Sequence, residues 1–192
     1  MGQRASTYSY ESSTVQSAYG SYVSGGISLW GTNIAMSYTS SVSNAVGVFG
    51  VTDAAVNYNA ATLVTSVNSS TGHRTGYIIT ISSQNFNSSS KTTAGKYRTI
   101  AHEIGHAYGL GHVPSSSNIM YSYYSATKNV TSQDIWGMKV VTHIHQHSSS
   151  TTGTYSEYSV DSHKVLCASC GGIYIQAHTF SSGVCTKCGY TQ

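Results

Sequence analysis

The segment that most constrains this chain is residues 102–112, which reads HEIGHAYGLGH. His102 and His106 are four residues apart, so on a helix both imidazoles project from one face. That separation lets two neutral ring nitrogens bind one Zn²⁺ at about 2.0–2.1 Å. Glu103 lies next to the same face, where its carboxylate can reach a water on the metal. The segment therefore predicts a helix that carries a metal site.

Gly109 predicts where this helix ends. A third ligand six residues after His106 would lie on the wrong side of the metal if the helix continued. Glycine adopts positive φ at little cost, so the chain can turn at Gly109 and bring His112 back to the metal. Three protein ligands leave the fourth position of a tetrahedral zinc ion to water, which is the arrangement of a catalytic site.

The spacing HExxHxxGxxH followed by a methionine turn resembles the metzincin zinc proteases. Met120 comes eight residues after His112, within the sequence NIMY, and this offset is most similar to the matrixin branch. The resemblance covers roughly residues 1–145. It implies an α+β catalytic domain, with a mixed twisted sheet, an active-site helix and a C-terminal helix. It also implies that Met120 forms an apolar floor beneath the zinc.

The resemblance further implies a zinc-dependent endopeptidase in which Glu103 is the general base. Metzincins bind the substrate backbone along an exposed strand before the catalytic helix, and Tyr77–Ser82 is the candidate strand. The segment after the methionine, about Tyr121–Val130, contains Lys128 and no acid, which indicates a mostly apolar or aromatic-lined pocket. The residues predicted to contact substrate are Tyr77, Ile79, Ile81, Tyr121, Tyr123 and Tyr124.

The chain departs from related enzymes at several positions. Val113 follows the third histidine, where matrixins usually have serine. Ser122 stands where astacin- and serralysin-like enzymes have a tyrosine ligand, so no tyrosine ligand is predicted. The chain has only six acidic residues, and calcium sites need clustered carboxylates. We therefore expect one catalytic zinc and no structural calcium in this domain.

Hydrophobic spacing predicts the elements around the motif. The first dozen residues are polar and are expected to be loose. Helices are predicted over Ser12–Ser37, where the pair Gly25-Gly26 weakens the pattern, over Ala94–Tyr108, and from Thr131. Runs rich in β-branched residues predict strands at Ala45–Thr52, Thr62–Val67 and Tyr77–Ile81. Composition then divides the chain into a catalytic domain (1–145), a Ser/Thr-rich flexible linker (146–156) and a small cysteine-rich module (157–192).

The module holds all four cysteines of the chain, in two CxxC pairs. Four thiolates at this spacing can close a tetrahedral structural zinc, and the predicted ligands are Cys167, Cys170, Cys185 and Cys188. Two disulfides are the alternative, because secreted proteins favour oxidised pairs. His163 and His178 are nearby and are expected to be solvated or to lie behind the ligands. The module resembles the zinc-ribbon-like tails of Gram-positive surface and secreted proteins.

Charge and composition limit the partners. The nine Lys and Arg are scattered, whereas a phosphate backbone needs a clustered basic footprint, so nucleic-acid binding gains no support. No apolar stretch is long enough to span a membrane. We expect a monomer that acts on protein or peptide substrates and is secreted by or displayed on a bacterial cell, with no signal peptide in this chain.

Two other functions fit parts of the pattern. One is a non-catalytic zinc-binding adhesion or interaction protein with a degenerate protease fold, although the intact Glu103 argues against it. The other is a zinc-ribbon nucleic-acid binder with an incidental HExxH, which the scattered basic residues disfavour.

Overall fold

A computed structural model of the 192-residue chain describes residues 5–68, 73–125, 127–142, 153–168 and 173–191. The chain divides into two compact units. One unit is Gln3–Thr142, and the other contains His143–Gln192 together with Met1–Gly2. No helix in the described part of the chain is both long enough and apolar enough to cross a membrane.

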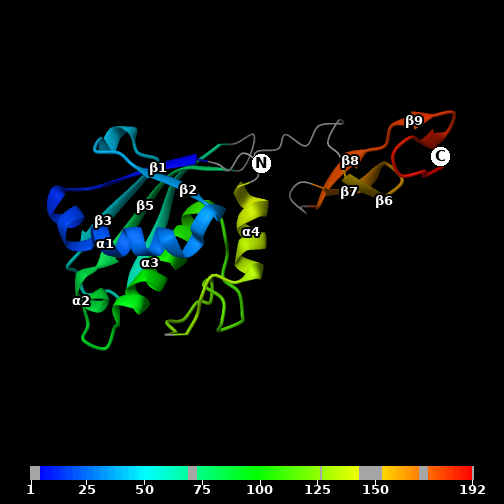
Figure 1. Ribbon diagram of the computed structural model, residues 1–192. Helices are drawn as coiled ribbons and strands as arrows, with labels where there is room; N and C mark the ends of the chain where they lie inside the picture. Colours follow the sequence, from blue (N-terminus) through cyan, green and yellow to red (C-terminus); the bar gives the residue numbers. More distant parts are fainter. Residues whose placement is uncertain (1–4, 69–72, 126, 143–152, 169–172, 192) are drawn as a thin grey trace. The chain divides into compact units, whose positions relative to one another are not determined.

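The first unit is built on a mixed five-stranded sheet in the order β2-β1-β3-β5-β4 (Figure 1). Its strands are β1 (Ala5–Tyr10), β2 (Ala35–Tyr38), β3 (Gly47–Thr52), β4 (Ala60–Val67) and β5 (Arg74–Ser82). Strands β1, β2, β3 and β5 pair in parallel, whereas β4 pairs antiparallel with β5. The antiparallel strand β4 is therefore one edge of this sheet.

Two long helices, α1 and α3, pack against each other and against the sheet (Figure 1). The helices of the unit are α1 (Ser13–Trp30), α2 (Ser83–Phe86), α3 (Thr93–Tyr108) and α4 (Ser132–Thr142), with 3₁₀ turns η1 (Gly31–Asn33) and η2 (Val42–Asn44). Buried side chains of α1, α3 and the strands form one core, in which Trp30, Phe49, Ile79 and Ile104 are fully enclosed. This core fixes α3, the helix of the histidine motif.

The glycine pair in α1 lets the two long helices approach closely. A Cβ atom on Gly25 would overlap the ring of Tyr97, and one on Gly26 would overlap the side chain of Ile100. The helix runs through both glycines without a break. The conformational cost of glycine in a helix is therefore offset by packing against α3.

The prediction that the first dozen residues are loose is wrong for residues 5–10, whereas residues 1–4 lie outside the described residues. Ala5–Tyr10 form β1, an interior strand between β2 and β3. The rings of Tyr8 and Tyr10 are buried and meet edge-on at 5.8 Å. The buried hydroxyl of Ser6 lies 3.4 Å from the hydroxyl of Tyr77. The tyrosine rings supply the apolar surface of this strand. Its hydroxyl groups can be buried because they lie close to hydrogen-bonding partners.

The other predicted elements of this unit are present with shifted ends. The first helix stops at Trp30 and a separate strand, β2, follows within the range predicted as helical. The strands β3, β4 and β5 and the helix α3 lie where the pattern predicts them. The predicted helix from Thr131 begins one residue later, at Ser132, and Thr131 caps it: its N–H donates to the Asp134 carboxylate at 2.8 Å and its hydroxyl accepts from the Asp134 N–H at 3.4 Å.

The second unit contains two small antiparallel sheets. Strands β6 (Gly153–Glu157), β7 (Ser162–Cys167) and β8 (Ile173–Ala177) form one, and β9 (Phe180–Ser181) and β10 (Val184–Cys185) form the other. Residues 146–152 of the predicted linker lie outside the described residues. Residues 153–156 belong to β6, so the linker prediction is wrong there. Thr154 and Tyr155 favour strands, and their backbone pairs with β7.

Candidate active site

Three histidines meet where α3 ends. The Nε2 atom of His106 lies 3.1 Å from that of His102 and 3.1 Å from that of His112. The Nε2 atoms of His102 and His112 are 3.3 Å apart. Nitrogen ligands of a tetrahedral zinc ion, each at its usual bond length, are separated by about 3.3–3.4 Å. The three nitrogens therefore fit a single zinc ion, with one position left for water.

Backbone carbonyls select the tautomer of two of these rings. The Nδ1–H of His102 donates to the carbonyl oxygen of Ile119 at 2.8 Å. The Nδ1–H of His106 donates to the carbonyl oxygen of Leu110, also at 2.8 Å. A carbonyl can only accept, so the proton must be on Nδ1 and each Nε2 keeps a lone pair. Such contacts behind a metal ligand orient the ring and raise its basicity.

The surroundings also keep these two rings neutral. Burial, assisted by the positive charge of Lys128, lowers the pKa of His102 to about 3. Burial likewise lowers the pKa of His106 below its usual range. A neutral imidazole is the form that binds a metal, so His102 and His106 are in the protonation state that metal binding requires.

The predicted turn at Gly109 is confirmed. Gly109 has a φ of 121° and follows the last residue of α3. Its N–H donates to the carbonyl of His106 at 3.0 Å, and the N–H of Leu110 donates to the carbonyl of Gly105 at 2.9 Å. This closing geometry needs a residue that accepts positive φ, and it returns the chain to the metal position at His112.

Met120 packs directly beneath the histidine helix. A Cβ atom on Gly105 would overlap the sulfur of Met120, and Met120 is fully buried. The carboxylate of Asp134 accepts from the backbone N–H groups of Ile119 at 3.2 Å and Met120 at 3.4 Å. Asp134 thus joins α4 to the methionine turn, a role that no local sequence pattern reveals because the turn precedes it by 14–15 residues.

Glu103 lies in a sheltered position beside the histidines, with 6% of its surface exposed. Its carboxylate accepts a hydrogen bond from the hydroxyl of Thr62 at 2.7 Å. Burial raises the pKa of Glu103 to about 7, against the Thr62 hydrogen bond and the charge of Lys128, which both lower it. The sequence does not reveal this role of Thr62, since its contact with Glu103 depends on how β4 packs against α3.

A cleft of about 240 Å³ opens beside Glu103 and His102. Its other lining residues are Asn57, Tyr58, Asn59, Ala60, Thr99, Ser122, Tyr123, Tyr124 and Lys128. The expectation of a mostly apolar or aromatic-lined pocket is therefore wrong. Tyrosines do line the cleft, but a second wall comes from the polar segment before β4, which the sequence does not connect with the segment after Met120.

The predicted substrate strand Tyr77–Ser82 is also wrong. These residues lie in β5, which has β3 on one side and β4 on the other. The side chains of Tyr77, Ile79 and Ile81 are buried in the core. The hairpin partner β4 occupies the edge instead. A local hydrophobic pattern predicts that a strand exists, but not which strand has an unpaired side.

The tyrosines after the methionine turn are placed differently from one another. Tyr123 and Tyr124 line the cleft, whereas Tyr121 is not among its lining residues. Instead, the backbone of Tyr121 forms a bridge with Val113, and its carbonyl accepts from the Lys128 ammonium at 3.3 Å. Tyr121 thus holds the loop that carries the other two.

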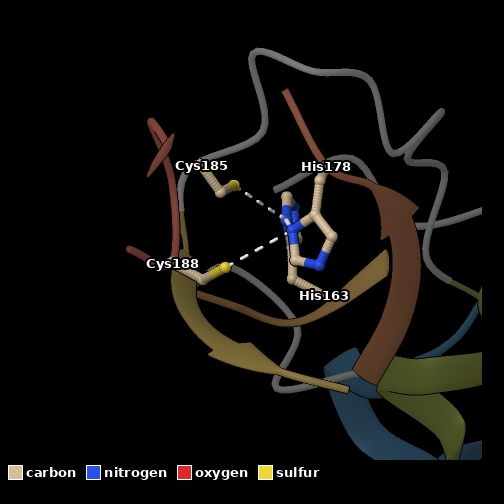
Figure 2. Close-up of side chains that lie close together, drawn as sticks. All are labelled: His163, His178, Cys185 and Cys188. Atoms are coloured by element: carbon tan, nitrogen blue, oxygen red, sulfur yellow. Dashed lines mark hydrogen bonds between the residues drawn. The ribbon is translucent and has the colours of Figure 1, made fainter. Parts of the chain in front are cut away.

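Of the four predicted cysteine ligands, the structure describes three, and it groups Cys185 and Cys188 without Cys167. Cys170 lies outside the described residues. Cys185 and Cys188 lie with His163 and His178, with all four ligand atoms within 4.8 Å of one another (Figure 2). His163 is 1% exposed, so the expectation that it is solvated is wrong. Among the described residues, the two cysteines are thus grouped with two histidines.

Comparison with known proteins bears on the first unit. The matrixin family model matches residues 51–143. The matched stretch includes the three histidines, Glu103 and Met120, and it supports a metzincin, matrixin-like relationship and a zinc metallopeptidase-like domain. A search of curated proteins finds no match.

Proposed function

We propose that this chain is a zinc-dependent endopeptidase. The observation that supports this most strongly is the meeting of three histidine Nε2 atoms at 3.1–3.3 Å beside a buried carboxylate. His102, His106 and His112 would hold the zinc ion. This spacing fits a tetrahedral ion, and the three ligands leave one position open.

When bound, zinc supplies an electrophile that polarises a peptide carbonyl and makes a water more acidic. The chain's own residues carry the proton. Glu103 takes the proton from the attacking water and returns it to the leaving amine, acting first as base and then as acid. Thr62 holds the carboxylate in place, and burial excludes competing water.

The substrate backbone would pair with the edge strand β4. This strand has a partner on one side only and carries Thr62 next to Glu103. An extended peptide added along this edge would bring its carbonyl groups past the histidines. Backbone pairing gives affinity with little sequence choice, so the choice would come from the adjacent cleft.

The lining of the cleft favours substrates that place a polar or acidic side chain in it. Lys128 lines it and is 4% exposed, and asparagines form part of the facing wall. Buried polar groups reject a side chain that leaves them unpaired. Cleavage-site profiling with a peptide library should show acidic or amide side chains enriched at one subsite, and a preference for large apolar side chains there would contradict the assignment.

Casein digestion by the purified chain tests the proposed activity. We expect digestion that stops when a chelator removes the metal and returns when zinc is added back. Digestion that continues in excess chelator would exclude a zinc mechanism. Absence of digestion in the zinc-loaded chain would instead favour the non-catalytic alternative.

A further inference from the structure

The second unit contains a compact group of four side chains that no part of the proposed peptidase mechanism uses. The Nδ1 atoms of His163 and His178 are 3.4 Å apart. The sulfur of Cys185 lies 3.6 Å from Nδ1 of His163, and the sulfur of Cys188 lies 3.5 Å from Nδ1 of His178. Figure 2 shows both sulfurs directed at the imidazole nitrogens.

These separations match the edges of a zinc tetrahedron. With bonds of about 2.05 Å to nitrogen and 2.3 Å to sulfur, two nitrogen ligands lie about 3.3 Å apart and a nitrogen and a sulfur about 3.6 Å apart. All three separations agree with these values. Ordinary contacts between thiols and imidazoles do not require four donor atoms to converge on one point.

Hydrogen bonds behind the rings favour the tautomer that a metal needs. The Nε2–H of His178 donates to the carbonyl oxygen of Ser159 at 3.0 Å. The Nε2–H of His163 faces the side-chain oxygen of Gln176 at 3.4 Å. With the proton on Nε2, each Nδ1 presents a lone pair toward the sulfurs.

The described part of the unit has a small hydrophobic core. Among its described residues, the buried apolar side chains are Val165, Cys167 and Cys185. A unit of this size with so small a core usually needs a metal or disulfides. The four side chains come from both sheets: His163 from β7, Cys185 from β10, and the other two from the adjoining turns. One ion would therefore join the two sheets.

The predicted four-cysteine site cannot share this ion. Cys167 and His163 are four residues apart on β7, which separates them by about 13 Å along an extended strand. A zinc ion within bonding distance of His163 is therefore out of reach of Cys167. The two arrangements compete for Cys185 and Cys188, and the described geometry favours the histidines.

We propose that His163, His178, Cys185 and Cys188 bind a structural zinc ion that holds the C-terminal unit together. Four protein ligands close the coordination sphere and leave no position for substrate. This site is separate from the peptidase centre and does not depend on the proposed activity.

Zinc content of the full-length chain tests the ligand set. Relative to the wild type, His178→Ala and Cys188→Ser should each lose one zinc per chain, whereas the matched control Cys170→Ser should lose none. We expect the same zinc losses when each variant also carries Glu103→Ala. The zinc content therefore tests the structural site whether or not the chain is a peptidase. Retention of zinc by His178→Ala, or loss of one zinc by Cys170→Ser, would overturn the proposal.

Cobalt substitution of the wild-type chain provides a measurement that does not depend on a variant folding. Only a site with thiolates gives sulfur-to-cobalt charge-transfer absorption, so the three-histidine centre does not contribute. We expect the intensity of two thiolates per chain. Absorption with the intensity of four thiolates, or none, would overturn the assignment.

Discussion

The contacts of Glu103 determine the pH at which its carboxylate can accept a proton. The residue is buried, which disfavours its charge, and one hydroxyl, that of Thr62, donates to it. Lys128 contributes a favourable charge. The proposed activity would therefore depend on a balance between desolvation and two nearby groups that lie far from Glu103 in the sequence.

Removing the Thr62 hydroxyl should move the acidic limb of the pH–rate profile. The hydroxyl stabilises the ionised form, so Thr62→Val raises the pKa of Glu103, and a higher pH is needed to ionise the base. A hydrogen bond to a charged group is worth about 1.5–3 kcal/mol, which corresponds to a shift of roughly one pH unit or more. The measurement is kcat/KM against pH, with the exposed Thr65→Val on the same strand as control. A limb that stays in place would show that Thr62 does not act on Glu103.

Gly105 is required because Met120 occupies the space where its side chain would be. Gly105→Ala should force the methionine sulfur aside and destabilise the chain by about 1–3 kcal/mol, as overpacking does elsewhere. Gly111→Ala is the matched control, because a Cβ atom there meets nothing within 4 Å. Denaturant unfolding of both variants gives the comparison. Equal stability of the two would argue against the methionine floor.

At the scale of elements, Asp134 connects helix α4 to the metal site. Its carboxylate binds the N–H of Ile119, and the carbonyl of Ile119 in turn accepts from His102. The carboxylate is buried and also holds the N–H of Thr131. A change in α4 can therefore reach a proposed zinc ligand through a single residue, Ile119.

Asp134→Ala should lower both stability and zinc affinity. It leaves buried N–H groups of the methionine turn without a partner, at a cost of roughly 1–3 kcal/mol each. Loss of a contact behind a ligand typically weakens metal binding about 10–100-fold. Unfolding and zinc titration measure the two effects, with the exposed Lys139→Ala in the same helix as control. An unchanged zinc affinity would contradict the proposal that Asp134 supports the zinc ligand His102.

The elements differ in how far the sequence determines them. Helix α3 was predictable because its apolar spacing and the turn at Gly109 are local properties. Strand β1 was not, since buried tyrosine and serine resemble a polar loop until their partners are known. The edge position of β4 and the contact of Thr62 with Glu103 depend on pairing order, which no local pattern contains. His163 was not predicted as a ligand, because the two CxxC pairs alone suggest a complete ligand set.

On the scale of the whole molecule, the two units differ in what stabilises them. The first has a continuous core of tyrosine, isoleucine and tryptophan side chains. The described part of the second has few buried apolar side chains and the group of two histidines and two cysteines. Metal should therefore matter more to the folding of the second unit than to that of the first.

Chelation should affect the two units unequally. We expect backbone amides of β6–β8 to lose protection from hydrogen exchange when zinc is removed, while those of β3 and β5 keep it. Protection in β6–β8 should return on adding zinc, which serves as the control for irreversible damage. Equal protection of β6–β8 with and without metal would contradict a structural role for the ion.

The central claim is that Glu103 transfers a proton beside a zinc ion held by three histidines. The most direct test is kcat/KM of Glu103→Gln on a casein-derived peptide, measured together with the zinc content of the same sample. We predict full zinc content and a loss of at least about 10²–10⁴-fold in rate, the range for removal of a general base. A zinc-loaded Glu103→Gln chain that cleaves at the wild-type rate would contradict the claim.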